Sequence, residues 1–183
     1  MHKSAGITVF ATVASLVSSA PLEARTPPGP FPVNFNLQVS ATQHPSQFAG
    51  QYIYSYHTGA GAGIAAASSF QSDAMLANLQ SVNQVWEVAF SPSGTTDSWF
   101  LNLDYSSTIT GTAIATIGAS NPPDVSGFYM TDSGLRWGDA SFVNWAVCDG
   151  SYGVPQLFAI VDASAILPTT CETINLVTVS ASS

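Results

Sequence analysis

The residues best suited to chemistry gather in one aromatic stretch of the chain, between positions 127 and 158. We single out its two tryptophans, one of its two tyrosines and its three aspartates: Trp137, Trp145, Tyr152, Asp132, Asp139 and Asp149. Aromatic rings and carboxylates line sugar-binding faces, and a glycosidase needs two carboxylates about 5 to 9.5 Å apart. The same residues also have structural uses, because aspartates form turns and tryptophans fill β cores. We favour these structural roles and assign no catalytic residue, but we expect any ligand to bind in this stretch.

One of the histidines, His57, follows the tyrosine-rich run Tyr52–Tyr56 and lies just before a glycine cluster at Gly59–Gly63. Its imidazole could act as a general base or contact a ligand. We favour a plainer role, in which the histidine fixes the loop by a hydrogen bond. The glycine spacing does not fit a dinucleotide loop, which needs a parallel strand before it and a long helix after it. We therefore expect no cofactor.

The chain has two cysteines, Cys148 and Cys171. An exported protein with an even number of cysteines usually pairs them, so we predict a disulfide between these two. A metal site is the competing interpretation, but His44 and His57 lie roughly 90 residues or more upstream of Cys148. The aspartates also lack the spacing of an EF-hand calcium loop. We therefore predict no metal site.

The charge balance is strongly acidic. The chain has 11 Asp and Glu against 3 Lys and Arg, which gives a formal net charge of −8. A surface with so few basic groups cannot neutralise phosphates, so nucleic acids and anionic membranes are poor partners. We expect neither to bind.

The first residues have the pattern of a secretory signal. His2 and Lys3 form a short basic region, and an apolar run extends from Ala5 to Val17. This run of about 13 residues is shorter than the roughly 20 that a membrane span needs. We expect an extracellular product, with association to the cell wall as an open alternative. The expected segments are a signal peptide at 1–19, a proline-rich arm at 20–34 and one β domain at 35–183.

From Phe35 onward the dominant hydrophobic period is two, which is typical of half-buried strands. Ten such runs lie at about 35–39, 52–56, 85–90, 99–103, 112–117, 127–130, 135–137, 142–147, 157–161 and 174–179. One short helix is predicted over Asp73–Val82, where apolar residues share a helical face. We predict an all-β, single-domain antiparallel sandwich or barrel with one short helix. A β-trefoil is the alternative, placed second because the sequence has no clear threefold repeat.

Several stretches in a fixed order resemble a known family. They are Tyr56–Gly61, Gly127–Tyr129, Gly134–Trp137, Trp145–Asp149, Gly153–Phe158 and Cys171. The family comprises small secreted proteins of filamentous ascomycete fungi without an assigned biochemical function, often labelled hypothetical or IgE-binding. A fainter similarity connects the layout to phialide-type cell-wall proteins. The resemblance covers about Phe35 to Val179 and implies no catalytic residue. It fails at Gly150–Tyr152, where the family tends to be richer in aromatic residues, so a ligand bound there would differ.

These observations lead to one functional expectation and two alternatives. We expect a secreted, non-catalytic fungal surface or interaction protein whose partner is a cell-wall glycan or a host protein. The first alternative is a carbohydrate-binding module, and the second is a secreted hydrolase that uses a carboxylate pair. The candidate ligand-binding residues are His57 and the six residues of the aromatic stretch.

Overall fold

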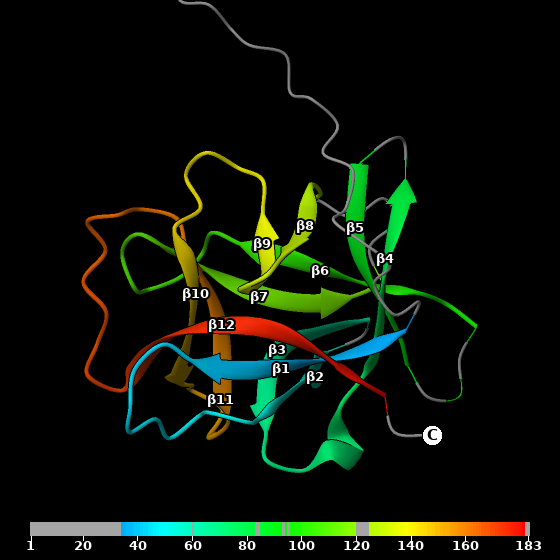
Figure 1. Ribbon diagram of the computed structural model, residues 1–183, viewed down its shortest axis with the longest axis horizontal. Helices are drawn as coiled ribbons and strands as arrows, with labels where there is room; N and C mark the ends of the chain where they lie inside the picture. The colour runs from blue at the N-terminus through cyan, green and yellow to red at the C-terminus, as the bar shows by residue number, and fades with distance from the viewer. Residues whose placement is uncertain are drawn as a thin grey trace, which may run out of the picture.

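The computed structural model describes residues 34–59, 61–82, 85–92, 94, 96–119 and 125–181. The predicted signal peptide and nearly all of the predicted proline-rich arm lie outside these ranges. The described residues form twelve strands and one single-turn 3-10 helix, η1 (Gln71–Asp73) (Figure 1). In the same ranges, no helix has the length and apolar character that crossing a membrane requires.

The strands follow one another through short turns and loops. They are β1 (Phe35–Ala41), β2 (Tyr52–Gly59), β3 (Ala62–Ser68), β4 (Leu76–Val82), β5 (Val85–Ser91), β6 (Trp99–Asp104), β7 (Thr112–Gly118), β8 (Phe128–Thr131), β9 (Gly134–Trp137), β10 (Asn144–Asp149), β11 (Pro155–Ile160) and β12 (Cys171–Ser180). The pairs between them are antiparallel, as the frequent short connections require.

The pairings close into an antiparallel barrel of nine strands, which runs through β1, β4, β5, β6, β7, β3, β11, β10 and β12. Strand β2 pairs with both β1 and β3, and β8 and β9 form a separate hairpin. Closure leaves the barrel with no free sheet edge to cover. The prediction of an all-β barrel is confirmed, and the chain forms a closed barrel rather than a two-sheet sandwich.

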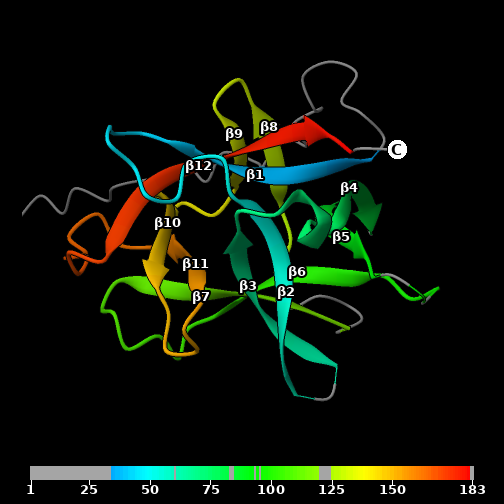
Figure 2. The same ribbon diagram turned by 90° about the horizontal axis from the view of Figure 1, so that it is seen from below.

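The strands also follow a threefold plan, in which β1–β4, β5–β8 and β9–β12 are three units of four strands. The middle strands of each unit form a hairpin, and the three hairpins pair with one another at Gly63–Ile117, Ala113–Ala159 and Gln156–Ala66. The outer strands of each unit lie beside each other, and β4–β5, β8–β9 and β12–β1 join the units. Figure 2 shows the hairpins on the lower side. This is the arrangement of a β-trefoil, the alternative considered from the sequence.

The barrel interior is filled by matching positions of the three hairpins. Ile53, Leu101 and Trp145 occupy these positions, each fully buried and each paired with a buried residue of the second hairpin strand. Two units therefore place a branched aliphatic side chain at this position, and the third places the larger indole there. The three units share a fold but fill their common core with different volumes, which hides the repeat in the sequence.

The helix predicted over Asp73–Val82 is wrong. Leu76–Val82 is strand β4, and all seven of its residues pair with β5. Seven cross-strand pairs supply the backbone hydrogen bonds and bury Ala77, so tertiary pairing overrides a helix-compatible composition. Within the described ranges, helical geometry is limited to the single turn Gln71–Asp73.

Candidate functional site

Trp137 and Trp145 belong to the core. The indole N–H of Trp145 donates to the carbonyl of Leu135 at 2.6 Å, and that of Trp137 donates to the carbonyl of Ser126 at 2.9 Å. The Phe142 ring lies edge-on to both indoles, with centroid distances of 6.3 Å to Trp137 and 5.0 Å to Trp145. Both rings are buried and their polar atoms satisfied. This corrects the interpretation in which they form an exposed binding platform.

The other five candidate residues are exposed, and the structure brings only some of them together. Asp132 lies in the β8–β9 turn and Asp139 in the β9–β10 loop, so these two belong to connections that hold none of the other three. Asp149 is the last residue of β10, Tyr152 lies in the β10–β11 turn that follows, and His57 lies near the end of β2. The ring of Tyr152 packs against that of Tyr56, with 5.9 Å between centroids. The β10–β11 turn therefore meets β2 next to His57.

A row of tyrosines runs along β2 on the outer face of the barrel. Tyr52, Tyr54 and Tyr56 alternate with Ile53, which is fully buried, so the three rings share the opposite, outward face. All three are half-buried, whereas Tyr152 is 54% exposed. We call these four tyrosines the tyrosine strip. Sequence reasoning selected only Tyr152; the signal for the others was the alternation of tyrosine along a predicted strand.

A carboxylate, that of Asp73, lies near Tyr54 of the tyrosine strip. Burial raises the pKa of the Tyr54 phenol, and the nearby Asp73 and Tyr56 add to this rise. Asp73 is anchored by a hydrogen bond from the Ser68 hydroxyl at 2.6 Å. The strip thus combines ring faces, phenolic hydroxyls and one fixed carboxylate, which can pack against apolar faces of a partner and hydrogen-bond to its polar groups.

Asp139 and Asp162 are the acceptors of two identical turns, Asp-Ala-Ser. Each carboxylate accepts bonds from the backbone N–H and hydroxyl of the serine two residues later, at 2.8 and 2.6 Å for Asp139 and 2.8 and 2.7 Å for Asp162. These bonds lower the pKa of both carboxyls. Neither group is a suitable proton donor, because a glycosidase acid needs a raised pKa. Within the described residues, no three His, Cys, Asp or Glu side chains gather as metal ligands.

Glu87 in β5 is a buried acid, only 4% exposed, and one of its carboxylate oxygens has no hydrogen-bond partner in the part of the chain that the structure describes. Burial raises the pKa of this carboxyl. The folded state therefore binds the proton more tightly than the unfolded state, and stability falls as the pH rises from the ordinary carboxyl pKa through the raised one. Above that window the ionised group opposes folding.

We expect Glu87→Gln to raise the free energy of unfolding at pH 7 by on the order of 1 kcal/mol. The gain should disappear below about pH 4, where Glu87 itself is protonated. Urea unfolding at several pH values measures both effects. Glu172→Gln is the control, because Glu172 accepts bonds from the Ser46 hydroxyl and the Gln47 N–H and should lose stability. Equal behaviour of the two variants would contradict this account.

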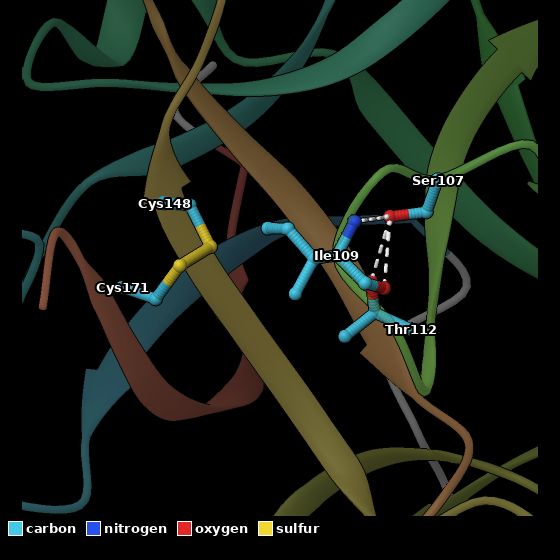
Figure 3. The surroundings of a disulfide bond; sticks show 5 residues. All are labelled: Ser107, Ile109, Thr112, Cys148 and Cys171. Carbon is cyan, nitrogen blue, oxygen red and sulfur yellow. Dashed lines mark hydrogen bonds between the residues drawn. A yellow bond between two sulfur atoms is a disulfide. The ribbon is translucent and has the colours of Figure 1, made fainter. Parts of the chain in front are cut away.

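Cys148 and Cys171 form the predicted disulfide. They are directly opposite each other in the β10–β12 pair, so the register itself brings the two sulfur atoms together. Figure 3 shows the Ile109 side chain reaching toward this disulfide from the β6–β7 loop. The backbone of that loop is fixed by Ser107, whose hydroxyl accepts from the Ile109 N–H at 3.1 Å and bonds to the Thr112 hydroxyl at 2.8 Å.

Comparison with known proteins adds one match. The model of a family described as Domain of unknown function (DUF7907) matches residues 32–180, nearly the whole of the predicted β domain. Neither the search of curated proteins nor the search of solved structures found a match.

Proposed function

This chain belongs to the family described as Domain of unknown function (DUF7907), and we propose that it is a secreted, non-catalytic interaction protein of a filamentous fungus. The proposed partner is a cell-wall glycan or a host protein, which the protein contacts through the tyrosine strip. The protein is released outside the cell, where it can remain associated with the wall.

Secretion is supported by the signal-like first 19 residues and by the disulfide, which is compatible with an extracellular location. Fungal origin and the link to phialide-type wall proteins rest on the resemblance described above. The absence of catalysis is supported by the state of the aspartates. Asp139 and Asp162 are committed to turns that keep them ionised, so neither can act as the acid of a hydrolytic pair.

The observation that carries the proposal is the contact between Tyr56 and Tyr152. Two tyrosines from different units pack ring to ring at the surface, and Tyr152 still exposes 54% of its side chain. Tyrosine is enriched at binding hot spots because a rigid ring supplies a large contact area and the hydroxyl supplies a hydrogen bond. Rings held by each other lose little freedom when a partner binds.

A carbohydrate-binding module is the second candidate, and the position of Asp73 favours it. Sugar rings have an apolar face of C–H groups and an edge of hydroxyls. The tyrosine rings suit the former, and the carboxylate of Asp73 beside Tyr54 suits the latter. In this version the glycan is the ligand itself, and binding needs no further protein.

Removal of one exposed ring tests the proposal. We expect Tyr152→Ala to weaken sedimentation of the mature protein with insoluble fungal wall material by about tenfold or more, since hot-spot rings contribute about 2 kcal/mol or more. The melting temperature should change little, because the side chain is mostly exposed. Tyr105→Ala is the matched control, since Tyr105 is 60% exposed outside the strip, and it should bind normally.

Equal losses in the two variants, or normal binding by Tyr152→Ala, would overturn the assignment of the strip. A glycan array of wall oligosaccharides then separates the two candidates. If the wild type binds the array and Tyr152→Ala does not, the result supports the carbohydrate-binding module. If protease treatment of the wall material removes binding, the result supports a protein partner.

A further inference from the structure

A hollow of about 420 Å³ lies between the β6–β7 and β11–β12 loops. Its volume is within the range of about 300–1,000 Å³ that small-molecule sites occupy. The lining residues that a ligand would contact through hydroxyl, carboxylate or large apolar groups are Thr108, Thr110, Asp162, Ser164, Ile166 and Pro168. None of these residues belongs to the tyrosine strip or to the aromatic stretch singled out in the sequence.

The two walls are held in place without a ligand. The N–H of Val161 donates to the carbonyl of Gly111 at 2.9 Å and joins the two loops. Gly111 has φ +80°, and a side chain there would lie 2.8 Å from the Cβ of Ala165, so the loops touch closely at this point. On the far wall, the Asp162 turn is closed by Ser164 and by the N–H of Ala165, which donates to the Asp162 carbonyl at 3.0 Å.

The floor is a small apolar cluster outside the barrel interior. Ile109 and Ala165 line the hollow and also pack against the buried residues Ala146, Cys148, Phe158 and Ile160. The disulfide belongs to this cluster, and Figure 3 shows Ile109 directed at it. A covalent cross-link therefore holds together the cluster against which Ile109 and Ala165 pack.

The rim carries a large apolar side chain with little cover. Ile166 is 89% exposed, although a side chain of this kind is normally buried. The same lining includes Pro168 and the hydroxyl-bearing residues Thr108, Thr110 and Ser164. A ligand that fits this lining has an apolar face for Ile166 and Pro168 and several hydroxyls for the polar groups.

We propose that this hollow is a binding site for a single sugar ring or a similarly sized neutral polyol. Asp162 accepts hydrogen bonds from the ligand hydroxyls, the Thr108 and Thr110 hydroxyls donate to or accept from the ligand, and the Ser164 oxygen, whose proton is donated to Asp162, accepts one. One Asp162 oxygen already accepts two bonds from Ser164, which leaves the other to the ligand. Among the described residues, the lining has no aromatic ring and a single carboxylate, so it offers little to an organic cation.

Saturation-transfer NMR with free monosaccharides of different hydroxyl configuration tests the site on the intact mature protein. We expect transfer to the ring C–H protons of at least one sugar, and saturable binding. Asp162→Asn should weaken the affinity about tenfold or more, because a hydrogen bond to a charged acceptor is replaced by a neutral one. Asparagine also supports this type of turn, so the loop should keep its shape.

Asp139→Asn is the matched control, because Asp139 heads the same Asp-Ala-Ser turn with the same two serine bonds outside the hollow. It should leave the affinity within about twofold of the wild type, a difference that corresponds to less than about 0.5 kcal/mol. Ile166→Ala provides a second variant that cannot disturb the core, and it should also weaken binding.

The site would be overturned if no monosaccharide bound saturably, or if Asp162→Asn and Asp139→Asn changed the sugar affinity equally. Binding of a small organic cation, ethanolammonium, in place of sugars would also overturn it. The site is independent of the tyrosine strip. Tyr152→Ala should leave monosaccharide binding in the hollow unchanged, and Asp162→Asn should leave wall sedimentation unchanged. Failure of one proposal is therefore distinguishable from failure of the other.

Discussion

Replacement of Trp145 by alanine is expected to lower the free energy of unfolding by about 3–5 kcal/mol. The indole is fully buried at the position where the third hairpin fills the barrel, stacked 6.5 Å from the Phe128 ring and edge-on to Phe142. Alanine leaves a cavity that β strands cannot close, because their spacing is fixed by hydrogen bonds. The loss also leaves the carbonyl of Leu135 without its indole donor.

Equilibrium unfolding in urea, followed by far-UV circular dichroism, measures this loss. Trp145→Phe keeps an aromatic ring but removes the indole N–H together with part of the ring volume, so it should cost less than the alanine variant, about 1–3 kcal/mol. Tyr105→Ala controls for the removal of an exposed ring and should stay within about 0.5 kcal/mol of the wild type. A change below about 1 kcal/mol for Trp145→Ala would remove this indole from the core.

Loss of the disulfide has the second largest expected effect. Cys148→Ala combined with Cys171→Ala should lower stability by about 2–5 kcal/mol, since the bond closes a segment whose ends are 23 residues apart. The apolar cluster around Ile109 then also loses its covalent support. Urea unfolding of the double variant, and of the wild type with and without reductant, measures the difference.

The control for the disulfide is chemical. Alkylation of the natively folded wild type without reductant should label no thiol, and labelling after reduction should modify both cysteines. Two reactive thiols in the untreated folded protein would contradict the cross-link. Reductant should leave the stability of the double variant unchanged, because no disulfide remains in it.

Most strands could be predicted because alternation of apolar and polar residues reports directly on a sheet with one buried face. Two could not. Strand β3 (Ala62–Ser68) is largely alanine and glycine, which have low β-propensity, and its place is set by pairing with β2, β7 and β11. The apolar residues of strand β4 have a spacing compatible with a helix, and the pairing with β5 makes this segment a strand.

The threefold plan was hidden for a different reason. A trefoil needs matching backbone positions, and the matching side chains Ile53, Leu101 and Trp145 differ in size and shape. Packing conserves total volume rather than residue identity, so a single sequence shows no repeat. Pairing between units, such as that between Gly63 and Ile117, joins distant residues and leaves no local signal.

The disulfide followed from composition, but the candidate sites did not. Tryptophan occurs both in exposed sugar-binding surfaces and in protein cores, and only the burial of Trp137 and Trp145 in the structure assigns them to the core. The Tyr56–Tyr152 contact joins β2 to a turn nearly a hundred residues later. The hollow beside Ile166 likewise depends on the approach of two loops at Gly111.

The pairing of β1 with β12 has a consequence for the order of folding. All seven residues of β1 pair with residues at the other end of the domain, between Ile174 and Ser180. At about 5–20 residues per second, a ribosome needs on the order of ten seconds to make the intervening chain. Throughout that time, β1 presents the apolar side chains Phe35, Leu37 and Val39 without their final neighbour. The domain therefore has many contacts between distant residues, and it completes folding only after β12 emerges.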